Sequence, residues 1–262
     1  MRIKVTIVGN SHVAALRRGW DLIQDDFDVD LQFFAANSTL FGQLSLNEKK
    51  SFGMHDTTSF KPKHVDFLKS QFGKTAIDLA ASDAVVVAGQ GIREKDFIRN
   101  LAKFSVDNIR EAEGLPLLSE DAFHDFAKAI IQKSNMFEKW ANWDCSKVFL
   151  LPSPIPLDGC PEDKEIYRVW AQFSATPNRN VEFLERFHAI VAKELAEQSI
   201  SLVSPPWSVL GENGLTRKEY GGNARRLDQS LNNYKNDYHH MEAEYGAVVM
   251  RHLLEQVLAE TT

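Results

Sequence analysis

The chain has 262 residues, of which 44% are hydrophobic and 25% are charged, and its net charge at pH 7 is −6. This length is enough for one large domain or at most two small ones, and the composition is typical of a soluble globular protein. The acidic balance provides no basic surface for nucleic acid, so we expect no nucleic-acid partner. Cys145 and Cys160 show neither a disulfide framework nor a metal-ligand spacing, which favours two unpaired thiols over a pair.

The first residues resemble neither a signal peptide nor a membrane anchor. MRIK leads directly into the apolar run VTIV, and no apolar run reaches the roughly 18 residues needed to cross a bilayer. We therefore expect a cytoplasmic protein with no membrane partner.

Five apolar runs have the length and residue types of β-strands. Two of them, at 85–88 and 148–151, are continuously apolar, which is expected of strands buried on both faces. The five predicted strands span residues 3–9, 29–36, 83–89, 147–153 and 200–206.

Helical patterns lie between and after these strands. Val13, Leu16, Trp20 and Ile23 fall on one face of a helix that follows Ser11. Similar stripes occur at 178–198 (Val181, Leu184, Val191 and Leu195) and at 241–258 (Tyr245, Val248, Val249, Leu253 and Val257). Strands that alternate with helices predict an α/β fold, namely a three-layer α/β/α sandwich around a mostly parallel five-stranded sheet.

Two stretches depart from this alternation. Residues 43–75 are polar and contain Gly53 and Pro62, whereas residues 92–142 have a mostly helical pattern in which Ser119 is a good N-cap. We interpret both as insertions at the edge of the sheet within a single domain, 1–262.

The first strand ends on Gly9-Asn10-Ser11-His12. Ligands of parallel α/β sheets bind beyond the carboxyl ends of the strands, and Ser11 is predicted there, at the start of a helix whose first N–H groups lack partners. A serine in that place can be a nucleophile whose own N–H stabilises the oxyanion that it creates. It can equally be a simple helix cap, which capping preferences alone favour.

A second signal precedes the last helix, in the run KNDYHHMEAEYGAVV at 235–249. Asp237 and His240 are three residues apart, so the carboxylate can orient an imidazole that activates a distant serine hydroxyl. The alternative is an Asp N-cap followed by two exposed histidines. The spacing from Asp237 favours His240 as the partner of Ser11. His239 is adjacent, so a shift of one residue would change the partner, and this alternative stays open.

Taken together, Gly9-Asn10-Ser11-His12 and Asp237-Tyr238-His239-His240 resemble the two end motifs of the SGNH hydrolases, the GDSL-like esterase and lipase superfamily. The resemblance implies the same flavodoxin-like three-layer fold, with Ser11 as nucleophile, His240 as general base and Asp237 as its orienting carboxylate. The family takes its other oxyanion donors from a glycine after the second strand and an asparagine after the third. The residues here that correspond to these donors are Asn37, Ser38 and Gln90, in addition to the N–H of Ser11.

The resemblance predicts a serine esterase that hydrolyses small acyl esters, with O-acetyl groups on carbohydrate as the favoured substrate and no metal or cofactor. Two alternatives stay open: a catalytically weak protein that binds carbohydrate or a partner, and an acyltransferase in polysaccharide handling. The expected partner is therefore a small-molecule or carbohydrate ester. The candidate substrate contacts are Asn10, His12, Gly89 and Trp207.

Other motifs allow weaker interpretations. AGQGI at 88–92 resembles a phosphate-binding glycine loop but lacks the full spacing, which favours a glycine turn near the serine. Trp140, Trp143 and Trp207 could stack on sugar rings, although packing is the commoner role of tryptophan. The loop RKEYGGNARR at 217–226 carries four cations that could bind an anionic group if it folds over the site.

Overall fold

The structure is a computed structural model that describes residues 2–109, 113–132, 140, 147–176, 179–228 and 237–261. Cys145 and Trp143, two residues considered in the sequence analysis, lie outside this part of the chain. Among the residues described, no helix combines the length and the apolarity that crossing a membrane requires.

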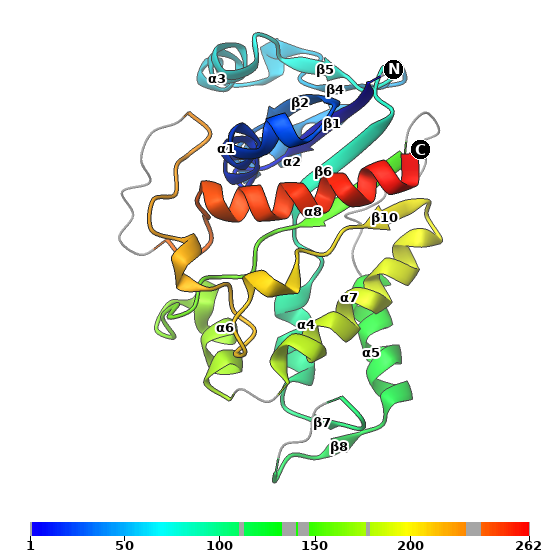
Figure 1. Cartoon of the computed structure of the whole chain (residues 1–262), viewed down its shortest axis with the longest axis vertical. Coiled ribbons are helices and arrows are strands. Elements are labelled where there is room, and N and C mark those ends of the chain that lie inside the picture. The colour runs from blue at the N-terminus through cyan, green and yellow to red at the C-terminus, as the bar shows by residue number, and fades with distance from the viewer. Residues whose placement is uncertain are drawn as a thin grey trace.

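A five-stranded parallel sheet forms the centre of the molecule (Figure 1). Its strands lie in the order β10-β9-β6-β1-β2, so the predicted α/β sandwich is confirmed. The strand bounds are β1 (Ile3–Gly9), β2 (Val29–Ala35), β6 (Ala84–Gln90), β9 (Lys147–Pro152) and β10 (Ile200–Leu202). The last predicted strand is the one most shortened, because Pro205 and Pro206 cannot donate hydrogen bonds to a neighbouring strand.

The strand order reverses between β1 and β6. The chain moves from β1 outward to β2, returns to β6 on the other side of β1, and then continues to β9 and β10. Right-handed crossovers then place the helix after β1 on one face and the later crossovers on the other. The point of reversal leaves a crevice beyond the carboxyl ends of β1 and β6, which is where ligands bind in such sheets.

Helices cover both faces of the sheet. The remaining helices and short strands are α1 (Val13–Ile23), α2 (Ser38–Gln43), β3 (Ser45–Leu46), β4 (Ser51–Gly53), α3 (Pro62–Phe72), β5 (Ala76–Asp78), α4 (Glu94–Leu101), β7 (Ser105–Val106), β8 (Leu117–Leu118), α5 (Glu120–Gln132), α6 (Glu165–Ala175), α7 (Asn180–Ala196) and α8 (Ala243–Thr261). The predicted helices at 13–23, 178–198 and 241–258 correspond to α1, α7 and α8. Val248 is the exception within its stripe, because 37% of it is exposed.

Helices α1 and α8 lie side by side on one face of the sheet (Figure 1). Two glycines allow this close approach, since a Cβ atom on Gly19 would overlap the backbone of Gly246 and Ala247, and a Cβ atom on Gly246 would overlap the backbone of Ala15. The contact joins the first helix of the chain to the last. It therefore brings together the two segments, 9–12 and 237–240, that the sequence analysis singled out.

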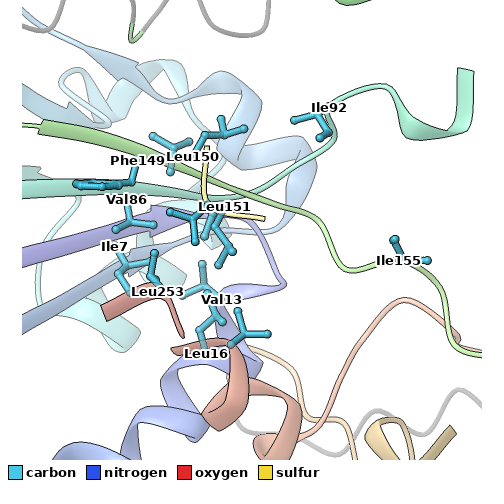
Figure 2. Close-up of a cluster of buried hydrophobic side chains, with 14 of the residues drawn as sticks. Ile7, Val13, Leu16, Val86, Ile92, Phe149, Leu150, Leu151, Ile155 and Leu253 are labelled. Atoms are coloured by element: carbon cyan, nitrogen blue, oxygen red, sulfur yellow. The ribbon is translucent and has the colours of Figure 1, made fainter. Parts of the chain in front are cut away.

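The core under these two helices is aliphatic. Figure 2 shows Val13 and Leu16 of α1 and Leu253 of α8 gathered with Ile7 of β1 and Leu151 of β9. All five side chains are at most 3% exposed. Burying a side chain of this size stabilises the fold by about 1.5–3 kcal/mol, so this packing holds the β1–α1 corner firmly in place.

The two predicted insertions contain regular structure. Within 43–75, strands β3 and β4 pair antiparallel and continue to β5, and α3 begins with Pro62 in its first turn and ends at Gly73, whose φ is +69°. Within 92–142 lie α4 and α5. The hydroxyl of Ser119 accepts the N–H of Ala122 at 3.2 Å, so the predicted N-cap is confirmed.

Candidate active site

Asn10 holds the corner between β1 and α1 through hydrogen bonds of its side chain to other residues of the protein. Its Nδ2 donates to the carbonyl of Gly89, and its Oδ1 accepts the N–H of His12 at 3.1 Å. Asn10 is 8% exposed. Although Asn10 was a candidate substrate contact, the structure places its amide as a brace between β1 and the end of β6.

Gly89 makes this brace possible. It lies at a β-bulge between Ala88 and Gln90, and its φ is +79°, a conformation that side chains with a Cβ rarely adopt. A Cβ atom here would overlap the side chain of Asn10. The carbonyl of Gly89 also accepts the hydroxyl of Ser153 at 2.6 Å. The AGQG segment is thus a glycine turn that closes against the corner holding Ser11.

Ser11, His240 and Asp237 form a continuous chain of hydrogen bonds. Ser11 Oγ lies 3.0 Å from His240 Nε2, and His240 Nδ1 lies 2.6 Å from Asp237 Oδ2. With the carboxylate as acceptor, Nδ1 carries the imidazole proton and Nε2 is left to accept the hydroxyl proton of Ser11. This is the geometry of a nucleophile, a general base and an orienting carboxylate.

Asp237 is locked by its own local backbone. Its Oδ1 accepts the N–H groups of His239 and His240 at 3.0 and 3.2 Å, which leaves Oδ2 for the imidazole of His240. Side chains of Asp commonly form such turns with the residues that follow them. The three-residue spacing read from the sequence is therefore used both for the turn and for orienting the base.

The structure brings His240, not His239, to Ser11. The ring of His239 packs instead on Tyr167, with ring centroids 4.8 Å apart. Burial lowers the pKa of His239 to about 4, so this ring is neutral at pH 7. The ambiguity between the two adjacent histidines is thus resolved by tertiary packing.

His12 packs against the ring of His240. Its ring is stacked on that of His240, with centroids 5.3 Å apart and an interplanar angle of 29°. Burial, followed by the neighbouring His240, lowers the pKa of His12 to about 3. Its Nδ1 is buried and has no hydrogen-bond partner within the described part of the chain. A neutral ring here restricts the motion of His240 without competing for the proton of Ser11.

Candidate oxyanion donors surround Ser11 on the β2 side. Asn37 Oδ1 accepts the N–H of Leu40 at 2.9 Å and so caps α2, which leaves the Nδ2 group as the donating end of this side chain. Asn37 and Ser38 both line a cavity beside Ser11. Gln90 ends β6, and its backbone carbonyl accepts the N–H of Ser153 at 3.0 Å. Gln90 is not among the residues that line the two cavities next to Ser11.

Two cavities meet at Ser11, Ser38 and His240. The first is also lined by Phe67, so we name it the Phe67 cavity, and its volume is about 380 Å³. The second is also lined by Glu94, so we name it the Glu94 cavity, and its volume is about 490 Å³. Both volumes fall within the range of about 300–1,000 Å³ that is usual for small-molecule sites. His12 and His239 line the Glu94 cavity, and Asn37 and Asp237 line the Phe67 cavity.

The tryptophans that were considered as sugar contacts lie elsewhere or pack inside the protein. Trp207 contacts the ring of His188, 5.0 Å away, and belongs to neither cavity wall, while Trp140 is 4% exposed and packs on Phe52. Trp170 does line the Glu94 cavity. Its place in the pattern of α6 gave no sign of this, because the residue reads as part of an ordinary buried face.

The basic loop at 217–226 reaches the site through Arg226, which lines the Phe67 cavity. The loop is tied to the start of α8 by Glu242, whose carboxylate accepts the N–H groups of Gly222 and Asn223 at 3.4 and 3.2 Å. Sequence reasoning missed Glu94 and Phe67. Glu94 was detectable in principle because it follows the end of β6, whereas nothing in the pattern of α3 distinguished Phe67.

Among the described residues, no group of three histidine, cysteine or acidic side chains is placed to hold a metal ion. Comparison with known proteins found no protein-family model that matches the chain and no curated protein that is significantly similar to it.

Proposed function

We propose that this protein is a serine ester hydrolase of the SGNH type, with Ser11 as nucleophile, His240 as general base and Asp237 as orienting carboxylate. The observation that carries the proposal is the pair of hydrogen bonds, 3.0 and 2.6 Å, that joins these three side chains across 229 residues of sequence. A simple N-cap role for Ser11 would not require an imidazole with its own carboxylate at the hydroxyl.

In the proposed first half-reaction, Ser11 Oγ attacks the carbonyl carbon of the ester while its proton passes to His240 Nε2. The tetrahedral intermediate then collapses as the bond from carbon to the alcohol oxygen breaks. His240 returns the proton to that oxygen, the alcohol leaves, and the acyl group remains on Ser11. Asp237 stabilises the imidazolium that exists between these two proton transfers.

In the second half-reaction, a water molecule takes the place of the alcohol. His240 Nε2 removes a proton from the water as its oxygen attacks the acyl carbon, and the proton then returns to Ser11 Oγ as the acid is released. Both half-reactions develop negative charge on the carbonyl oxygen. The proposed donors to this oxygen are the N–H of Ser11, Ser38 and the Nδ2 group of Asn37, with Gln90 as a further predicted donor.

The proposed substrates are small acyl esters, with O-acetyl groups on carbohydrate as the leading class and the cytoplasm as the leading compartment. The buried free thiol of Cys160 is compatible with a reducing compartment. Acyl transfer is the second candidate, because two cavities open on the same serine and an acceptor alcohol could follow the leaving one into the Glu94 cavity.

Labelling with a fluorophosphonate probe, followed by peptide mass spectrometry, tests the proposal. We expect one phosphonylated serine, Ser11, and loss of the label in a His240→Gln variant. A folded protein that shows no label at Ser11 and no hydrolysis of 4-nitrophenyl acetate would contradict the function. Release of acetylated glycerol instead of acetate, when glycerol is added, would assign transfer rather than hydrolysis.

A further inference from the structure

A buried carboxyl group faces the Glu94 cavity. Glu94 is 7% exposed and lines the cavity at the first residue of α4. Its Oε2 accepts the N–H of Ile92 at 3.2 Å, and its Oε1 lies 3.8 Å from His188 Nε2, which is too far for a hydrogen bond. The side chain thus has one oxygen that anchors the turn and a second that is not held by His188. Burying a carboxyl group is costly unless it acquires partners, so its position calls for a role.

The other charged side chains of this cavity are already engaged. Arg93 Nη1 contacts Asp96 Oδ2 at 2.8 Å, and Lys95 Nζ donates to the backbone carbonyl of Glu165 at 3.2 Å. When Glu94 is ionised, Arg93 and Lys95 balance Glu94 and Asp96, and these four side chains then contribute no net charge. A charged ligand would meet one like charge for every opposite charge. An uncharged ligand with hydroxyl groups can instead use both donors and acceptors.

The Phe67 cavity has a different character. Phe67 is partly buried and Leu227 is 7% exposed. Of the charged residues of this wall, Arg226 and Asp228 are exposed to solvent, and the partly buried Asp237 is hydrogen-bonded to His240. Apolar side chains at the inner wall suit the acyl part of an ester. No carboxyl group as deeply buried as Glu94 lines this cavity.

We propose that the Glu94 cavity is the alcohol subsite and that Glu94 determines specificity there by accepting a hydrogen bond from a hydroxyl group of an uncharged, hydroxyl-rich alcohol. The Phe67 cavity then receives the acyl group. The inference rests on the proposed ester hydrolysis, because it assigns the two sides of the same scissile bond. Glu94 acts on binding and takes no part in the proton transfers of Ser11 and His240.

A matched pair of esters tests this assignment. Glycerol 1-acetate and propyl acetate carry the same acyl group and the same number of alcohol carbons, and they differ only in two hydroxyl groups. Above pH 7, where Glu94 is ionised, a hydrogen bond to its charged carboxylate contributes enough to change an equilibrium about tenfold or more. We therefore expect the wild type to prefer glycerol 1-acetate by at least about tenfold in kcat/KM, chiefly through KM.

In Glu94→Leu, the preference for glycerol 1-acetate should fall by at least about tenfold. Glu94→Gln retains an acceptor for the N–H of Ile92, and its preference should lie between those of the wild type and Glu94→Leu. Glu255→Gln on the exposed side of α8 is the matched control and should keep the wild-type preference. If the two esters lose equally in both Glu94 variants, Glu94 only anchors the turn and the inference is overturned. A wild type without any preference overturns it as well.

The failure of this inference is distinguishable from failure of the proposed function. Fluorophosphonate labelling of Ser11 is measured on the same protein samples. Labelling that depends on His240, combined with no effect of Glu94 on ester preference, removes the alcohol subsite and keeps the hydrolase. If neither labelling nor hydrolysis of either ester occurs, both proposals fail together.

Discussion

The two halves of the candidate site are built in different ways. The proposed proton-transfer half consists of Ser11, His240 and Asp237, which are joined by hydrogen bonds. The proposed oxyanion half consists of Asn37 and Ser38, which line the Phe67 cavity, and of Gln90, which lines neither cavity. In the first half each side chain follows from a short local motif. In the second half the candidate donors depend on where the backbone runs after β2 and β6, and the glycine turn at Gly89, held by the buried Asn10, lies at the end of β6.

The spacing of Asp237 and His240 predicted the hydrogen bonds that reach Ser11, whereas the sequence did not predict how the other polar groups around Ser11 are used. Asn10 illustrates the reason. Its amide is the obvious polar group beside Ser11, yet it braces Gly89 and the N–H of His12. Asn37, further along the sequence, caps α2 with its oxygen and keeps its nitrogen on the side of the cavity.

The largest expected effect tests the proton-transfer half. Ser11→Ala should abolish covalent labelling and lower kcat for ester hydrolysis by about 10⁴-fold or more, because no other group supplies the attacking oxygen. Ser70→Ala, an exposed serine on α3, is the matched control and should label like the wild type. Retained turnover in Ser11→Ala would contradict a role of this hydroxyl as the nucleophile.

The two adjacent histidines give a sharper test of the same half. His240→Gln should lower kcat about 10⁴-fold, since the base itself is removed. His239→Gln, which changes a ring packed on Tyr167, should cost at least a hundredfold less. Stopped assays with 4-nitrophenyl acetate measure both. Equal losses of kcat in the two variants would indicate that both changes act by disturbing the local packing, and they would contradict the role of His240 as general base.

The oxyanion half is tested by a change that spares the fold. Asn37→Asp keeps the oxygen that caps α2 and replaces only the nitrogen donor. If Asn37 stabilises the oxyanion, kcat should fall by about 10²–10³-fold, with melting temperature little changed. Gln90→Glu provides the comparison at the other candidate donor. A larger loss of kcat in Gln90→Glu than in Asn37→Asp would indicate that Gln90, at the end of β6, is the donor in place of Asn37.

The contact that joins the two ends of the chain is tested by stability. Gly246→Ala inserts a methyl group into the backbone of α1, and we expect the free energy of unfolding to fall by about 1–3 kcal/mol or more. Gly42→Ala, where no atom lies within 4 Å of the new Cβ, is the control and should be neutral or slightly stabilising. Chemical denaturation measures both. If the two variants behave alike, the close approach of α1 and α8 is not as tight as described.

The last expected effect is a pH dependence of stability that is specific to Glu94. Burial raises the pKa of Glu94 from its ordinary value of 4.5 to about 7, so between these pH values the folded protein holds a proton that the unfolded chain has lost. The associated stability is present below about pH 4.5 and is lost as the pH rises through 7. The free energy of unfolding should therefore fall by a few kcal/mol over this range relative to Glu94→Gln, as measured by urea denaturation at each pH. Parallel pH profiles of the two proteins would contradict the burial of an ionisable carboxyl group.

Apolar periodicity and short motifs in the sequence predicted the strands of the central sheet, the helices α1, α7 and α8, the N-cap at Ser119, and the meeting of Ser11 with Asp237 and one of two adjacent histidines. These features follow from periodicity, local propensity and a three-residue spacing, all of which act over a few neighbouring residues. The tertiary structure was needed to show that His240 rather than His239 contacts Ser11, that the amide of Asn10 binds Gly89 and His12, and that Glu94 and Phe67 line the two cavities. Those outcomes depend on contacts between segments far apart in the chain, such as the glycine contact of α1 with α8, and no local pattern encodes such contacts.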